Sequence, residues 1–152
     1  MAGTHHPPDP AFETRVRTSF ARQAFMVTLG AQLITVEPGR VVIELPFQAD
    51  HTQQHGFLHA GVVTALADSA CGYAALSLMP RGTAVLSVEF KVNLMKPATG
   101  NRFRAVGAVL RAGRTLSVCS ADVQARREGE WMDVAVMQAT MMTVRDGGDL
   151  SD

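Results

Sequence analysis

The most apolar stretch of the sequence, residues 60–79, contains one charged residue, Asp68. Burying a carboxylate costs free energy unless the group is hydrogen-bonded, paired with a cation or used in a reaction. A carboxylate held in such a stretch can act as a general base that activates water. The structural alternative is that Asp68 caps the end of a loop or forms an ion pair with an arginine from the basic strands. Asp68 is therefore the first candidate for a catalytic residue.

The residues just before Asp68's stretch, from His59 to Gly61, stand where a helix should begin. The first backbone N–H groups of a helix have no partner within it, and they carry a partial positive charge of about half a unit. Such groups can bind a carbonyl oxygen while negative charge develops on it, and each well-placed donor contributes about 3 kcal/mol. The alternative is that Gly61 only permits close packing.

Two other side-chain patterns are candidates for reactive sites. His51, His55 and His59 are spaced by four residues, which on one helix would suit a metal ion. Because Gly56 interrupts this segment and no acid or cysteine completes a ligand set, we expect no metal site. Cys71 lies in the apolar stretch, but no histidine is spaced to activate it, so we expect a small buried residue.

Apolar spacing predicts the elements that must position these residues. Residues 60–79 are apolar almost all round, which is typical of a buried helix. Residues 11–26 carry apolar side chains at four-residue steps, which predicts a short amphipathic helix. Residues 31–47 contain two β-branched runs joined at 37–40, where Pro followed by Gly suits a type II turn. These two runs predict a β-hairpin.

The second half of the chain is predicted to consist of strands. Residues 86–94 alternate strictly, and an apolar face is expected to hold Leu86, Val88, Phe90, Val92 and Leu94. Three more extended runs follow at 101–111, 115–126 and 131–144, and the short turns between them favour antiparallel neighbours.

The order of these elements predicts the α+β class, with a curved antiparallel sheet wrapped around a long central helix and a short N-terminal helix. The length of 152 residues suits a single domain over residues 1–152. Within it, we expect residues 1–10 to be irregular and residues 145–152 to form a flexible tail.

Composition and charge narrow the class of partner. The chain is 47% hydrophobic and 18% charged, with a formal net charge of zero. Residues 81–127 nevertheless hold nine Lys and Arg against two acids. A nucleic-acid-binding protein would usually have a higher net charge and a recognisable motif, so no nucleic-acid partner is expected. A local anionic group such as a phosphate suits the basic middle better, and a solvated sheet face rich in arginine would explain it equally well.

The cellular location is also predicted by the sequence. The two cysteines lack CxxC spacing and the first residues lack the apolar core of a signal peptide, so we expect a cytoplasmic protein. The apolar stretch 60–79 is rich in small residues and contains an acid, which favours a buried helix over a membrane span.

Two segments resemble the hotdog-fold acyl-CoA thioesterases, in particular the phenylacetic-acid-pathway (PaaI-like) and 4-hydroxybenzoyl-CoA thioesterases. The family signature has Asn, then Gly, then His-Gly-Gly two residues later, and an acid about two turns into the following helix. The spacing is matched here by Gly56, His59, Ala60, Gly61 and Asp68. The second segment, residues 87–100, resembles the central strand of the family and its closing Pro-Ala-x-Gly turn.

This resemblance implies hydrolysis of an acyl-CoA thioester, with Asp68 as general base or nucleophile. The N–H of Ala60, together with that of Gly61, would form the oxyanion hole. Gln53 stands where the family usually has Asn, so its amide would act from one carbon further out. Ala60 replaces the first Gly of His-Gly-Gly, which keeps the N–H but adds a methyl group. His59 would be a structural member of the turn.

The resemblance also implies roles for other residues. Ser87 falls near the position where some relatives have a hydroxyl that holds the attacking water. Strict alternation puts Ser87 on the face opposite the apolar one, so this role would require a bulge in the strand. The site would lie between subunits of a dimer, commonly within a tetramer, and coenzyme A would be part of the substrate rather than a cofactor. The expected substrate-binding residues are Gly56, Phe57, Val62 and Leu66 around the acyl group and Lys96, Arg111 and Arg114 for the phosphates.

The sequence is also compatible with two other functions. Hotdog proteins also host hydratases and dehydratases that use a His and an acid, and His59 and Asp68 supply both types. A non-catalytic acyl-CoA-binding module would explain the departures at Gln53 and Ala60.

Overall fold

The computed structural model describes residues 5–145 and residue 150. The helices are α1 (Phe12–Arg22), α2 (Ala24–Leu29) and α3 (Ala60–Leu76), with a 3-10 turn at Ala49–His51. The strands are β1 (Gln32–Glu37), β2 (Arg40–Pro46), β3 (Ala84–Leu94), β4 (Arg102–Arg111), β5 (Leu116–Arg127) and β6 (Glu130–Val144). Residues 5–10 contain neither helix nor strand, and most of the predicted tail lies outside the described residues.

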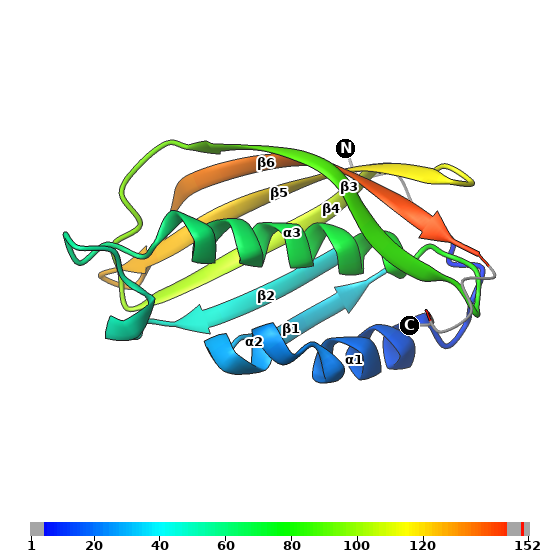
Figure 1. Ribbon diagram of the computed structural model, residues 1–152, viewed down its shortest axis with the longest axis horizontal. Helices are drawn as coiled ribbons and strands as arrows, with labels where there is room; N and C mark the ends of the chain where they lie inside the picture. Colours follow the sequence, from blue (N-terminus) through cyan, green and yellow to red (C-terminus); the bar gives the residue numbers. More distant parts are fainter. Residues whose placement is uncertain (1–4, 146–149, 151–152) are drawn as a thin grey trace.

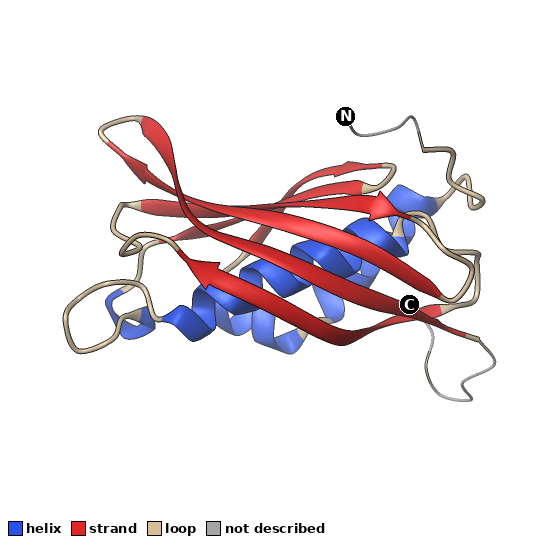
Figure 2. Ribbon diagram, turned by 90° about the horizontal axis from the view of Figure 1, so that it is seen from above, coloured by secondary structure: helices blue, strands red, loops and turns tan. Residues whose placement is uncertain are grey.

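The six strands form one antiparallel sheet in the order β1-β2-β4-β5-β6-β3. The sheet curves around α3, and α1 and α2 lie beside α3 near β1 (Figures 1 and 2). The predicted α+β fold, a curved antiparallel sheet around a central helix, is confirmed. Because β1 and β3 are the two edges, β3 bonds to only one neighbour in the described chain.

Small residues allow α3 to lie close to the sheet. Gly107 of β4 faces Ala70 of α3, and a Cβ on this glycine would overlap the backbone carbonyl group of Ala70. Ala67, Ala70 and Ala74 of the helix are fully buried. The absence of larger side chains on these faces brings the two backbones together, and this explains why the predicted buried helix is rich in alanine.

The predicted hairpin is present, and its turn is tied to the central helix. Gly39 has φ +74°, which the third position of a type II turn requires. Its N–H donates to Oγ of Ser77 at 2.8 Å, just after the end of α3. The hairpin therefore fixes the C-terminal end of the helix against β1 and β2.

The predicted single helix over 11–26 is wrong, because the chain breaks at Gln23. This residue has an extended backbone (φ −77°, ψ 96°) that ends α1 and starts α2. The break lets α2 turn Met26 and Leu29 into the core. A continued helix would bury Ala24, the fourth residue of the apolar series at four-residue steps that begins at Phe12, but Ala24 is exposed.

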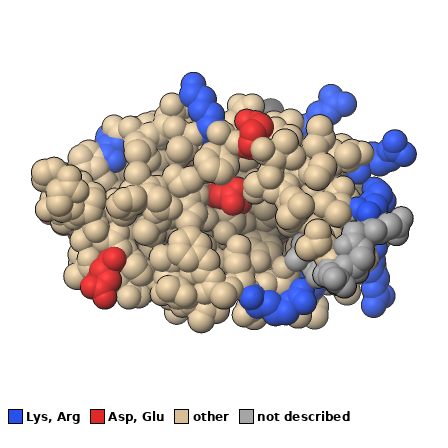
Figure 3. Space-filling model, viewed as in Figure 1, with Lys and Arg blue, Asp and Glu red and all other residues tan. Residues whose placement is uncertain are grey.

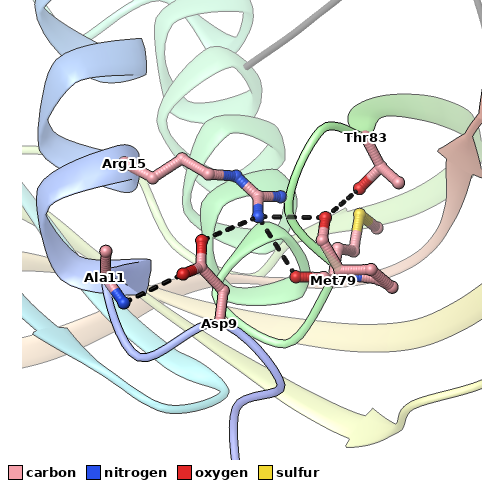
Figure 4. A network of polar contacts seen from close by, with 6 residues as sticks. Asp9, Ala11, Arg15, Met79 and Thr83 are labelled. Carbon is pink, nitrogen blue, oxygen red and sulfur yellow. Dashed lines mark hydrogen bonds and ion pairs between the residues drawn. The ribbon is translucent and has the colours of Figure 1, made fainter.

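Helix α1 is held in place by the Arg15 network, in which Arg15 joins Asp9 to the turn that follows α3 (Figure 4). Nη1 of Arg15 lies 3.3 Å from Oδ2 of Asp9 and donates to the carbonyl oxygens of Met79 and Pro80 at 3.2 and 3.0 Å. Thr83 donates to the same Pro80 carbonyl at 2.7 Å. Since both charged side chains are nearly buried, the network fixes how α1 lies along α3.

A β-bulge at Val88 changes the predicted faces of β3. Ser87 pairs with Met141, whereas Glu89 pairs with Thr140, so one extra residue stands on β3. As a result Ser87 and Phe90 both stand opposite residues that face the core, Met141 and Ala139. The prediction that Leu86 shares one face with Phe90 is therefore wrong, and the bulge is the reason.

Candidate active site

Asp68 and Ser87 are joined by a hydrogen bond across the gap between α3 and β3. Oγ of Ser87 donates to Oδ1 of Asp68 at 2.7 Å. Asp68 lies in the middle of α3, and its side chain is half-buried. The bulge at Val88 turns Ser87 toward the helix. A bulge at this place is what the expected role of Ser87, holding the attacking water, required.

The two side chains share a cavity of about 400 Å³ between α3, β3 and α1. Asp68 is the only carboxylate among its described lining residues. On the face seen in Figure 3, most of the surface is uncharged and basic side chains lie toward the rim. Because the cavity is open and Asp68 is only half-buried, a small polar molecule could reach Asp68 from solvent. The lining consists of Ser19, Arg22, Gln23, Asp68, Ser69, Gly72, Tyr73, Ala84, Val85, Leu86, Ser87 and Leu150.

The first turn of α3 leaves one backbone donor available. His59 is the N-cap, and its Nδ1 accepts the N–H of Gly61 at 2.8 Å. The N–H groups of Val62 and Val63 donate to the carbonyl oxygen of His59. Within the described residues, the N–H of Ala60 has no acceptor. Ala60 therefore remains the oxyanion-hole candidate, whereas the N–H of Gly61 is engaged with His59.

The loop before the helix places Gln53 and Phe57 beside this first turn. Oε1 of Gln53 accepts the N–H groups of His55 and Phe57, and this closes the loop on itself. Gly56 has φ +82°, a conformation that a residue with a side chain rarely adopts, so its place is in the turn. Gln53, Phe57 and Ala60 line a second cavity of about 310 Å³.

One chain does not bring Asp68 and Ala60 together. Eight residues of helix separate them, about 12 Å along the axis. They line different cavities, one beside Ser87 and the other beside Gln53. The catalytic residues expected from the sequence thus fall into two half-sites on each chain.

The structure divides the expected acyl-binding residues. Val62 and Leu66 have exposed fractions of 9% and 0%, and both belong to the hydrophobic core. They line none of the cavities described above, in contrast to the expectation. Phe57 and Lys96 both line the cavity of about 310 Å³ beside Gln53, here called the Gln53 cavity, and both also line a cavity of about 440 Å³ next to it.

The three cations expected to bind phosphates do not lie together either. Lys96 bonds through its N–H to Val134 of β6. Arg111 pairs with Val118, which pairs with Thr140 of β6. Six residues of strand separate Val134 from Thr140, about 20 Å. Arg111 and the exposed Arg114 in the following turn thus lie toward the opposite end of the sheet, and Arg114 accepts through its carbonyl oxygen a bond from Arg145.

Sequence reasoning missed the residues that close the Asp68 cavity on its α1 side. Gly72 and Tyr73 lie one helical turn after Asp68 and Ser69, a spacing that could have indicated them. Ser19 comes from α1 and Gln23 from the break between α1 and α2, and Oγ of Ser69 donates to Oε1 of Gln23 at 3.4 Å. No pattern in the sequence pairs these distant segments.

The other reactive patterns form no second site. His51 belongs to the 3-10 turn, His55 to the loop and His59 to the N-cap, so the three do not share a helix. Across residues 5–145 and 150, no three metal-ligating side chains of the His, Cys, Asp or Glu type gather. Burial raises the pKa of Cys119 to about 12 and raises that of Cys71 further, so both buried thiols stay protonated near neutral pH.

In the part of the chain that the structure describes, no helix combines the length and apolar character that a membrane crossing needs.

The chain is similar to thioesterases in both sequence and structure. A sequence model of the thioesterase superfamily matches residues 55–132. Human acyl-coenzyme A thioesterase 13 is 31% identical over 99 residues, which are 64% of this chain and 70% of that protein. A relative from Saccharolobus solfataricus is 34% identical over 90 residues, and the match spans 64% of that protein's length.

Two solved structures extend this similarity. A thioesterase family protein from Silicibacter pomeroyi is 53% identical, with a TM-score of 0.86 over 88% of this chain and 98% of that one. The E. coli PaaI protein from the phenylacetic acid degradation operon is 19% identical, with a TM-score of 0.79 over 88% and 94% of the two chains. The latter shares the hotdog fold.

Proposed function

The chain belongs to the thioesterase superfamily, a family of thioester hydrolases, and on this basis we propose that it hydrolyses acyl-CoA thioesters at Asp68 and Ser87. The observation that carries the assignment is the 2.7 Å hydrogen bond between these two side chains beside an open cavity. Asp68 acts as the general base: it takes a proton from a water that the Ser87 hydroxyl holds. That water attacks the thioester carbonyl, the carbon–sulfur bond then breaks, and Asp68 returns the proton to the sulfur, so that coenzyme A leaves as its thiol.

The oxyanion is stabilised by the N–H of Ala60 from a second copy of the chain. Asp68 and Ala60 of one chain are too far apart to act on one carbonyl, which supports a site shared between subunits. Strand β3 supplies a suitable contact, since it is an 11-residue sheet edge with exposed apolar side chains that include Val88, Phe90 and Leu94. The proposed assembly is a dimer or a dimer of dimers.

The proposed assignment also covers the coenzyme A part of the substrate. Lys96 lines the same cavity as Gln53 and Ala60, so it is the best-placed of the three expected cations to contact a phosphate near Ala60. No cofactor beyond the substrate is required for this chemistry, and the proposed location is the cytoplasm. Because Nδ1 of His59 accepts the N–H of Gly61, the proton of the neutral ring is on Nε2, and this cap leaves no free ring lone pair for the base of a hydratase reaction.

The test is release of free CoA thiol from aromatic and aliphatic acyl-CoAs by the wild type and by Asp68→Asn. Loss of the base should lower kcat by about 100-fold or more, while the fold is retained. Asp122→Asn, which removes an exposed carboxylate from the outer face of β5, is the matched control and should keep wild-type activity. A folded Asp68→Asn protein with near-wild-type turnover would defeat the assignment. Binding of acyl-CoA without turnover by the wild type would indicate a binding module instead.

A further inference from the structure

The cavity beside Asp68 owes part of its volume to a missing side chain. Gly72 follows Asp68 by four residues, so both lie on one face of α3, and both line the cavity. A Cβ built on Gly72 would meet no atom within 4 Å. The space over Gly72 is therefore open.

Neither packing nor backbone conformation requires a glycine at position 72. Gly107 is needed because its Cβ would overlap Ala70, and Gly56 is needed because its φ is positive. Gly72 has neither property, and a glycine inside a helix costs about 1 kcal/mol relative to alanine. The property that distinguishes this glycine from alanine at position 72 is the open space over it.

We propose that the space over Gly72 holds the acyl group of the substrate and that Gly72 sets the size of the acyl group accepted. This inference rests on the proposed function, because it takes Asp68 as the group that acts at the thioester carbonyl. From that carbonyl, an acyl chain that follows α3 for one turn, about 5.4 Å, reaches Gly72. Ser19 of α1 and Gln23, which joins α1 to α2, line the same cavity.

The dimensions of the cavity indicate the class of acyl group. Its volume of about 400 Å³ is near the lower end of the range for small-molecule sites, about 300 to 1,000 Å³. The wall on the α1 side carries the polar side chains of Ser19, Arg22 and Gln23, next to Ser69 of α3. The expected substrate therefore carries a compact acyl group, of aryl or medium-chain size, rather than a long fatty chain.

The experiment compares kcat/KM of the wild type, Gly72→Ala, Gly72→Val and Gly72→Leu across straight-chain acyl-CoAs from acetyl to palmitoyl, with phenylacetyl-CoA added. The chain length of best activity should become shorter as the side chain at position 72 grows. The measured quantity is kcat/KM for the wild type's best substrate divided by kcat/KM for the next shorter acyl-CoAs. Gly72→Val should lower this ratio by about tenfold or more. Thermal unfolding of each variant is the structural control, and Gly72→Ala should unfold at the wild-type temperature or above it.

The outcomes separate this inference from the function on which it rests. An unchanged chain-length profile, or an equal loss at every length, in variants of an active wild type would overturn the role of Gly72 and leave the thioesterase assignment standing. A wild type that releases no CoA from any acyl-CoA would overturn both.

Discussion

Ser87 reaches the carboxylate of Asp68 only because β3 contains one residue more than the segment of β6 that it pairs with. The bulge at Val88 puts Ser87 opposite the buried Met141, and from there its hydroxyl donates to Oδ1 of Asp68 at 2.7 Å. A regular strand would put Ser87 and Phe90 on opposite faces of the sheet, whereas here both stand opposite core-facing residues of β6. The local irregularity of one strand thus assembles the proposed catalytic pair.

Removal of the Ser87 hydroxyl should impair catalysis without unfolding the protein. In Ser87→Ala, the attacking water loses one of its two proposed partners, so kcat should fall about 10- to 100-fold with a smaller change in KM. Steady-state kinetics on one acyl-CoA would measure this effect. Ser120→Ala is the control, because Ser120 of β5 pairs with Ala108 and Gln138 and lines none of the cavities described. Equal kcat for Ser87→Ala and the wild type would contradict the role of the hydroxyl.

The N–H of Ala60 can be removed without disturbing the helix. Ala60 is the first residue of α3, a position that tolerates proline, and His59 has the extended backbone (φ −60°, ψ 137°) that a residue before proline adopts. Ala60→Pro should therefore fold and should lose about 100-fold or more in kcat, because the oxyanion loses its donor. Circular dichroism would check the fold and thiol release the activity.

Mixing two inactive variants tests whether the site is shared between subunits. A mixed dimer of Asp68→Asn and Ala60→Pro has one site with both groups intact. Random pairing in a 1:1 mixture should therefore restore about a quarter of the wild-type activity after subunit exchange. If both groups came from one chain, the mixture would stay as inactive as its components, and that result would refute the shared site.

The close contact between α3 and β4 makes Gly107 sensitive to substitution. Gly107→Ala should lower the free energy of unfolding by about 1 to 3 kcal/mol, because the added methyl group overlaps the backbone of Ala70. Urea denaturation would measure the loss. Gly72→Ala, on the open side of the same helix, is the matched control and should show no loss. Equal stability of the two variants would show that α3 can move away from the sheet at no cost.

The two buried cysteines should make stability fall at high pH. Burial raises the pKa of Cys119 from 9.0 to about 12, and that of Cys71 is raised as well. Above about pH 9 the unfolded chain loses thiol protons that the folded chain keeps, so the unfolded state binds fewer protons and stability declines with rising pH. Urea denaturation at pH 7 and pH 10 would show this decline. The double variant Cys71→Ala with Cys119→Ala should show a smaller one, and an identical decline in both proteins would argue against the thiols as its source.

The amino-acid sequence alone determined the elements that depend on local patterns. The apolar run predicted α3, the Pro-Gly step predicted the hairpin turn, and strict alternation predicted β3, because each pattern acts within a few residues of chain. The order of these elements then led to the α+β sheet around a helix. The motif from Gly56 to Asp68 led to thioester chemistry through resemblance, and that chemistry agrees with the family of the chain.

The tertiary structure decided what depends on contacts between distant segments. The bulge at Val88 follows from pairing with β6, and the break at Gln23 follows from the way α2 buries Met26 and Leu29. Val62 and Leu66 were expected around the acyl group but lie in the core, because the sheet covers their side of α3. The open space at Gly72 exists because β3 and α1 leave a gap over this face of α3. Helical periodicity in the sequence cannot distinguish a covered face of a helix from an open one.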